Sequence, residues 1–252
     1  MCTLSWTYHG VSHYRVYFNR DEQRTRQPAT EPQAMQLEQV NCLMPLDPEG
    51  GGSWIATNEY GVTVCLLNFY QGQMPQGPLT SRGQIVKQLA SSVSSQEVDR
   101  RMLALNLSHY APFTVVSFDT RRNANETVMW TWDGQALSHH RAVAPIVSSG
   151  RFFYEALDYR TSLFADLASQ SNDDTLGERF HTRHDTQRPH LSPLMAREDA
   201  RTVSITTVHV SPTDKIMGYQ AIDAGPLADL SPNARHYRVP TRIDLPTSIK
   251  ES

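Results

Sequence analysis

Strand-like and helix-like segments follow one another in blocks along this 252-residue chain. Segments rich in β-branched and aromatic residues, as in β-strands, occur at residues 2–8, 14–19, 53–69, 113–147 and 201–222. Helical periodicity is confined to residues 80–110 and 152–169. Strands and helices therefore do not alternate one by one, which argues against a parallel sheet built from βαβ units. We predict an α+β fold, a four-layer αββα sandwich, in a single domain over residues 1–252.

Local turn and capping signals indicate where several of these elements begin and end. The "NEYG" sequence at residues 58–61 separates two apolar runs and predicts a β-hairpin, and Asp133-Gly134 predicts another turn. Ser94 followed by Glu97 matches a capping box at the start of a helix. Residues 23–50 are rich in Gln, Pro and Glu and show little periodicity, so we expect an irregular surface segment there.

Composition limits the classes of function. A net charge of -3 gives no broad basic surface, so we expect no nucleic-acid partner. No apolar run approaches the roughly 18 residues that span a bilayer, so we expect no membrane span. Three cysteines without paired spacing (Cys2, Cys42 and Cys65) favour reduced thiols and a cytoplasmic location. The N-terminus lacks a signal-peptide pattern, so we expect the mature chain to begin at Met1 or Cys2.

The position of the first cysteine gives its thiol a particular chemical option. If Met1 is removed, Cys2 carries both the thiol and the free α-amino group of the chain. Such an amine has a reference pKa of roughly 7.7–8.0, so near pH 7 it can accept the proton of the thiol. Asp21 could hold the α-ammonium group, and Arg20 could stabilise the thiolate. The alternative is that Cys2 is a small apolar residue at the start of a strand.

Four segments of the sequence resemble known families. "MCT", "YFNRDE", "SWIATNEYGVTVCLLNFYQG" and "AREDARTVSITTV" resemble the NRDE family, the family of transport and Golgi organization protein 2. The family is named after the tetrapeptide found here at residues 19–22. The early segments are also similar to choloylglycine hydrolases and penicillin V acylases, which are N-terminal nucleophile hydrolases. This resemblance implies that Cys2 is the nucleophile, with Asp21 beside it and Asn68 as an oxyanion donor, and it matches a late arginine to Arg201.

The sequence also departs from the acylase pattern. Phe18 stands where the acylases have an arginine, three residues before the aspartate. Strand alternation would place Asn19 and Asp21 on one face and Arg20 on the other, so Arg20 replaces that arginine only if the strand bulges. A second oxyanion asparagine has no evident match, because "IVSSG" offers two serines, residues 148 and 149, in its place.

Two functions are consistent with these observations. The first is a cysteine amidohydrolase or acylase that cleaves a linear C–N amide bond in a small-molecule substrate, with Asn19, Trp54 and Phe69 as substrate-binding residues. The alternative, implied by the NRDE resemblance, is a non-catalytic binding or trafficking protein for haem or a lipid-linked ligand. We expect no metal or other cofactor in the hydrolase. The sequence is consistent with either a monomer or a homo-oligomer.

Other candidate sites carry less weight. His139 and His140 are adjacent on a predicted strand and face opposite ways, so they are expected to be exposed hairpin residues. The histidine-containing segment 181–190 is interpreted as a polar loop, with a metal site as the less favoured reading. Cys42 and Cys65 are interpreted as a loop thiol and a strand-packing residue.

Overall fold

The computed structural model describes residues 2–10, 12–122, 126–170, 174–222 and 235–240. Within them the chain forms two antiparallel sheets. Sheet A contains, in spatial order, β10 (Ile146–Ser148), β1 (Cys2–Tyr8), β2 (Tyr14–Gln23), β11 (Ala200–Val210), β12 (Lys215–Ala221) and β13 (Arg235–Arg238). Sheet B contains β3 (Gln33–Leu37), β4 (Val40–Met44), β5 (Ile55–Asn58), β6 (Val62–Asn68), β7 (Phe113–Asp119), β8 (Val128–Trp132) and β9 (Leu137–Arg141).

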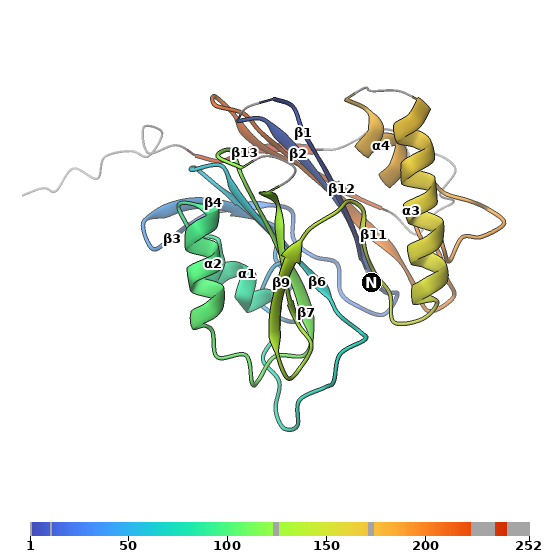
Figure 1. Cartoon of the computed structure of the whole chain (residues 1–252), viewed down its shortest axis with the longest axis horizontal. Coiled ribbons are helices and arrows are strands. Elements are labelled where there is room, and N and C mark those ends of the chain that lie inside the picture. Colours follow the sequence, from blue (N-terminus) through green and yellow to red (C-terminus); the bar gives the residue numbers. More distant parts are fainter. Residues whose placement is uncertain (1, 11, 123–125, 171–173, 223–234, 241–252) are drawn as a thin grey trace, which may run out of the picture.

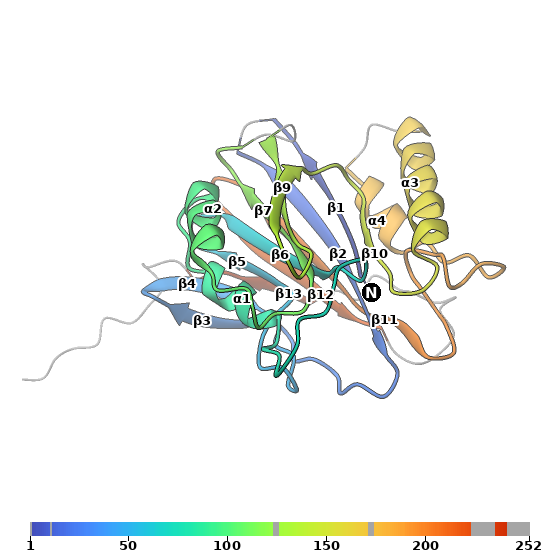
Figure 2. The same cartoon turned by 60° about the horizontal axis from the view of Figure 1, so that its bottom comes forward.

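Helices cover the outer faces of the two sheets, as Figures 1 and 2 show. Helices α1 (Gly83–Leu89) and α2 (Ser95–Ala104) pack on sheet B, against β6 and β7. Helices α3 (Phe153–Gln170) and α4 (Leu176–His181) pack on sheet A, where α4 contacts β1 and β2. The layers are therefore helix, sheet, sheet and helix, which confirms the predicted αββα sandwich.

Strand β6 contributes side chains to two hydrophobic cores, one on each face of sheet B. Val62, Val64 and Leu66 join the core beneath α1 and α2, whereas Cys65 and Leu67 join the core between the sheets. Because side chains alternate along a strand, a segment covered on both faces is apolar throughout. This accounts for the "VTVCLL" run, which is apolar apart from Thr63, and it places Cys65 as a packing residue between the sheets, as expected.

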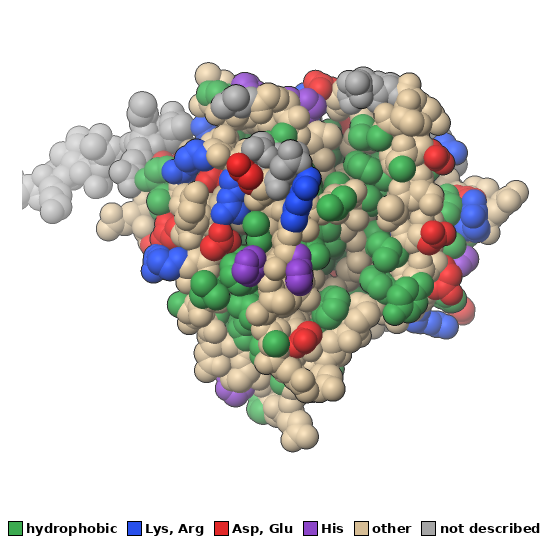
Figure 3. All heavy atoms as spheres, viewed as in Figure 1, with side chains coloured by type: hydrophobic (Ala, Val, Ile, Leu, Met, Phe, Trp, Pro, Cys, Tyr) green, Lys and Arg blue, Asp and Glu red, His purple; other side chains and the backbone are tan. Residues whose placement is uncertain are grey.

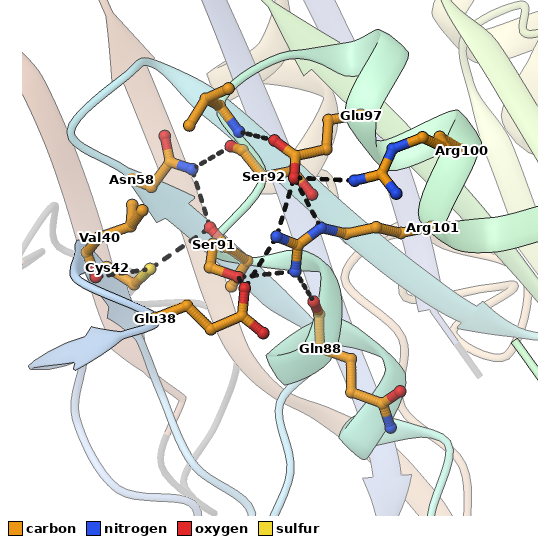
Figure 4. A network of polar contacts seen from close by, with 12 residues as sticks. Glu38, Val40, Cys42, Asn58, Gln88, Ser91, Ser92, Glu97, Arg100 and Arg101 are labelled. Atoms are coloured by element: carbon orange, nitrogen blue, oxygen red, sulfur yellow. Dashed lines mark hydrogen bonds and ion pairs between the residues drawn. The ribbon is translucent and has the colours of Figure 1, made fainter. Parts of the chain in front are cut away.

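The "NEYG" turn is held in place by a buried amide. Asn58 accepts hydrogen bonds from the backbone N–H groups of Tyr60 and Val62, and it donates to the carbonyls of Ala90 and Ser92 after α1. Figure 4 shows Asn58 within a larger polar network centred on Arg101 of α2. Asn58 thereby joins the hairpin to the helical layer through main-chain carbonyls at the end of α1.

The predicted capping box at the start of α2 is confirmed. Ser94 is the N-cap of α2, and its hydroxyl accepts a hydrogen bond from the backbone N–H of Glu97. The carboxylate of Glu97 reaches back to the backbone N–H of Val93, one residue before the cap. Helix α2 ends at Ala104, so the later part of the 94–110 segment is not helical.

Several expectations about secondary structure were wrong. The supposedly irregular segment 23–50 contains β3 and β4, and Cys42 is a buried β4 residue whose thiol donates to the carbonyl of Ala90, not a loop thiol. The run after the Asp133-Gly134 turn is not one strand, because β9 belongs to sheet B and β10 to sheet A. His181 begins the predicted polar loop but is the last residue of α4 and is fully buried.

Surface charge and helix hydrophobicity are relevant to the expectations about nucleic-acid and membrane binding. On the face seen in Figure 3, basic and acidic side chains are interspersed and form no continuous basic area. Among the described residues, no helix is long and apolar enough to cross a membrane.

Candidate active site

Cys2 occupies the first position of β1, the strand next to the edge strand β10 of sheet A. It pairs with Arg20 of β2 on one side and with Ser148 of β10 on the other. Side chains of directly paired residues point to the same face of a sheet. Cys2 belongs to the apolar core between the two sheets and is 8% exposed.

A cavity of about 790 Å³ opens beside this thiol. Its lining includes Cys2, Arg20, Asp21, Trp54 and Asn68, which come from four strands or strand ends far apart in the sequence. The volume falls within the range of roughly 300–1,000 Å³ that is usual for small-molecule sites. In the described part of the chain, no cluster of three or more His, Cys, Asp or Glu side chains is arranged to hold a metal ion.

Arg20 lies on the cavity side of β2. Its guanidinium is 4.4 Å from the centroid of the Trp54 ring and forms ion pairs with Glu22 at 3.2 Å and Asp47 at 3.8 Å. Phe18, two residues earlier, lies on the same face and is fully buried between the sheets. Arg20 thus supplies a cation opposite Cys2, two residues further along β2 than Phe18, the position that matches the arginine of the acylases.

Asp21 points to the opposite face of β2, toward the α3–α4 layer. One carboxylate oxygen accepts a hydrogen bond from the Thr202 hydroxyl at 2.7 Å, and the other lies 4.0 Å from a guanidinium nitrogen of Arg160. Burial raises the pKa of Asp21, and the charge of Arg160 opposes that rise. Asp21 is 1% exposed, so its carboxylate sits behind Cys2 and within the protein.

Arg160 of α3 fixes this arrangement. It is 1% exposed and donates to the backbone carbonyls of Leu191 and Ser192 and to the hydroxyl of Thr3. Burial lowers the pKa of Arg160, while the charge of Asp21 raises it. The pair is therefore a desolvated ion pair whose cation is held by three further hydrogen bonds.

Burial raises the pKa of the Cys2 thiol to about 11, while the backbone N–H of Asp21 acts in the other direction. A thiol with such a pKa is thiolate to about one part in 10⁴ at pH 7. A reaction at this sulfur therefore needs a base close to it.

Asn68 lies at the end of β6, beside the cavity and close to β10. Its side-chain nitrogen donates to the hydroxyl of Tyr70 at 2.9 Å, and its backbone carbonyl accepts a hydrogen bond from the Ser148 hydroxyl. Because Ser148 pairs directly with Cys2, this contact places Asn68 close to the Cys2 end of β1. Tyr70 and Asn68 both line the cavity.

Three of the predicted site residues do not line the cavity. Asn19 is fully buried on the other face of β2, where its amide donates to the carbonyls of His181 and Pro193. Phe69 is half-buried and bonds through its backbone to Pro112. Arg201 lies across from Glu22 in the β2–β11 pair. The substrate-binding role suggested for Asn19 and Phe69 is therefore not supported by their positions.

Sequence reasoning missed the cationic residues that complete the site. Arg160 carries a signal that could have revealed it, since it follows the buried Ala156 by four positions and so lies on the buried stripe of α3. Arg82 lines the cavity at the start of α1 and carries no comparable signal.

The comparisons with known proteins agree with this architecture. The family model for Transport and Golgi organisation 2 matches residues 1–223, so the chain belongs to this family. No curated protein sequence matches. The fold is similar to that of the Caenorhabditis elegans ortholog of N-acylethanolamine-hydrolyzing acid amidase, with a TM-score of 0.55 and 10% identity over 82% of this chain and 92% of that one.

A variant of conjugated bile acid hydrolase from Clostridium perfringens gives a TM-score of 0.50 and 11% identity over 95% of this chain and 97% of that one. At such identities the similarity shows the fold alone. The predicted relationship to N-terminal nucleophile hydrolases is confirmed at that level.

Proposed function

We propose that this member of the Transport and Golgi organisation 2 family is an N-terminal cysteine amidohydrolase that cleaves a linear C–N amide bond. The observation that carries the proposal is the convergence of Cys2, Arg20 and Asn68 at one cavity large enough for a small molecule, with the carboxylate of Asp21 buried behind Cys2. The fold is also similar to that of a worm protein described as an acid amidase that hydrolyses N-acylethanolamines.

The reaction follows from the positions of these groups. After removal of Met1, the α-amine of Cys2 takes the proton of the thiol, and the sulfur attacks the carbonyl carbon of the amide. The side-chain amide of Asn68 has two N–H donors, one of which bonds to the Tyr70 hydroxyl, and the second donates to the developing oxyanion. The ammonium group then protonates the leaving nitrogen, and the C–N bond breaks. Water, deprotonated by the same amine, hydrolyses the thioester and restores the thiol.

The surrounding charges support this assignment of the base. A thiol with a pKa near 11 is mostly protonated at neutral pH, so the amine is required for attack. The Asp21–Arg160 pair borders the same end of β1, where a carboxylate can hold an α-ammonium group in position. Arg20, directly across from Cys2, favours the thiolate once it forms.

A second candidate is a binding or trafficking protein that uses the same cavity without turnover. The family match supports it, and so does the burial that holds the Cys2 thiol in its protonated form. In this case the cavity binds its ligand, including haem or a lipid-linked molecule, and Cys2 packs as an apolar residue.

Intact-mass measurement and an insertion variant separate the two candidates. The hydrolase requires a mature chain that begins at Cys2. A glycine inserted between Met1 and Cys2 keeps the thiol but moves the α-amine away from it. We expect this insertion and Cys2→Ala to lose hydrolysis of a panel of acyl amides together, with the insertion reducing the rate by roughly 10²–10⁴. Retention of Met1, or full activity of the insertion variant, contradicts the proposal.

A further inference from the structure

The described residues that line the cavity include five arginines, and these differ in whether a carboxylate neutralises their charge. They are Arg20, Arg26, Arg82, Arg151 and Arg197. The first two share the carboxylates of Glu22 and Asp47, and Arg197 pairs with Asp199 at 2.8 Å. Within the described residues, Arg82 and Arg151 form no ion pair with a carboxylate.

Of these two, Arg82 is the one withdrawn from water. It is half-buried in the cavity wall, and one of its guanidinium nitrogens donates to the carbonyl of Pro112 at 2.9 Å. Arg151 is exposed, and its guanidinium lies 5.6 Å from the ring centroid of Phe152. Water therefore solvates Arg151, whereas Arg82 has lost part of its hydration without gaining an ion pair in the described chain.

Arg82 lines the same cavity as Cys2, Tyr70 and Glu22. Burial lowers the pKa of Arg82, and the charge of the Glu22 carboxylate opposes this change. The Pro112 bond uses one donor of the guanidinium, and a carboxylate matches the fork of donors that remains.

An apolar rim adjoins this cation. Tyr70, Met74 and Leu79 line the cavity and are 44%, 63% and 42% exposed. They lie in the segment that leads from β6 to Arg82, so the cationic and apolar parts of the lining are continuous along the chain. Exposed apolar side chains grouped at a cavity indicate contact with an apolar part of a ligand.

We propose that Arg82 binds a carboxylate of the ligand, so that the cavity takes acyl amides that carry both a carboxylate and an apolar group. The amide part of this inference rests on the proposed function, but recognition of the carboxylate does not. Arginine suits this role because its planar guanidinium binds a carboxylate through two parallel hydrogen bonds.

A matched pair of probes tests this inference. Hexanoylglycine and hexanoylglycinamide share the acyl chain and the amide bond and differ only in a terminal carboxylate or neutral carboxamide. Their hydrolysis is measured with the wild type, Arg82→Met and Arg15→Met, and their binding is measured by calorimetry with Cys2→Ala and Cys2→Ala/Arg82→Met. Arg15 is the control, because it also donates to a backbone carbonyl, that of Asp174, but lies outside the cavity lining.

We expect the wild type and Arg15→Met to prefer the carboxylate probe by roughly 10- to 100-fold, and Arg82→Met to lose this preference. The ratio between probes is insensitive to partial unfolding, which affects both probes alike. If neither probe is hydrolysed but Cys2→Ala prefers the carboxylate in an Arg82-dependent way, the proposed function fails and the carboxylate site stands. Equal hydrolysis or binding of the two probes by proteins that retain Arg82 overturns the inference, and so does a preference that survives in Arg82→Met.

Discussion

Replacing Arg160 by methionine tests whether the ion pair behind Cys2 holds the site together. The guanidinium lies 4.0 Å from the carboxylate of Asp21, and both residues are about 1% exposed. With an effective dielectric constant of about 20, charges at that distance attract by about 4 kcal/mol. Loss of one partner of a buried pair costs about 3–5 kcal/mol, in agreement with this value. For a chain of this size, 4 kcal/mol lowers the melting temperature by roughly 8–16 °C.

The loss should depend on pH in a defined direction. Burial already raises the pKa of Asp21, and removal of the Arg160 charge raises it further. A carboxyl group with a raised folded-state pKa binds more protons when folded than when unfolded. Its stability contribution therefore falls as the pH rises from the unfolded value, about 3.9, through the folded one. Arg160→Met should be closest to wild-type stability near pH 4 and furthest from it at pH 7.

Urea unfolding at pH 4.5 and 7.5 measures both effects. The double variant Asp21→Asn/Arg160→Met removes the carboxylate as well, so its loss of stability relative to wild type should not grow with pH. It should also be more stable at pH 7.5 than Arg160→Met alone. A cost below about 1 kcal/mol for Arg160→Met at pH 7.5, or a cost that is the same at both pH values, would refute the reasoning.

Three further variants or measurements follow from the contacts described. Asn68→Ala should lower amide hydrolysis by roughly 10²–10³ and leave the melting temperature nearly unchanged, because within the described chain its side chain bonds to the exposed Tyr70 and to no other residue; an unfolded product would show a structural role instead. Asn58→Ala should be destabilised by at least about 2 kcal/mol in urea, with no change in ligand affinity, since the buried Ser92 carbonyl loses its side-chain donor and the Ala90 carbonyl keeps only the weak Cys42 thiol donor. Iodoacetamide mapped by mass spectrometry should label Cys2 before Cys42 and Cys65, because only Cys2 lines the cavity and the other two are fully buried; earlier labelling of either would contradict this order.

The parts of the fold that could be predicted depend on short-range signals. The predicted first strand, residues 2–8, agrees with β1, and the capping box marks the start of α2 because a hydroxyl and a backbone N–H three residues apart must meet there. Strand β4 was missed because its five buried residues, one of which is the polar Asn41, show no alternation and follow a polar segment without periodicity. Its burial comes from β5 and from the helical layer, which no local pattern reveals.

The site could be predicted only where the chain was close to Cys2 in sequence or matched a known motif. Cys2, Arg20, Asp21, Trp54 and Asn68 were all identified in this way, and all line the cavity. The cations at positions 82 and 160 come from helices that are remote in sequence. Their roles depend on which sheet each helix covers, and the sequence does not specify this.

The side chains of the NRDE tetrapeptide, residues 19–22, alternate between the two faces of β2. Asn19 and Asp21 point to the outer helical layer, where one bonds to the end of α4 and the other lies beside Arg160 of α3. Arg20 and Glu22 point to the cavity, where they form an ion pair with each other. Because alternation along a strand is obligatory, a four-residue motif cannot place all of its side chains at one site. Asn19 and Asp21 therefore bind sheet A to the helical layer, while Arg20 and Glu22 determine the charge around Cys2. One strand thus contributes both to the stability of the fold and to the electrostatics of the cavity.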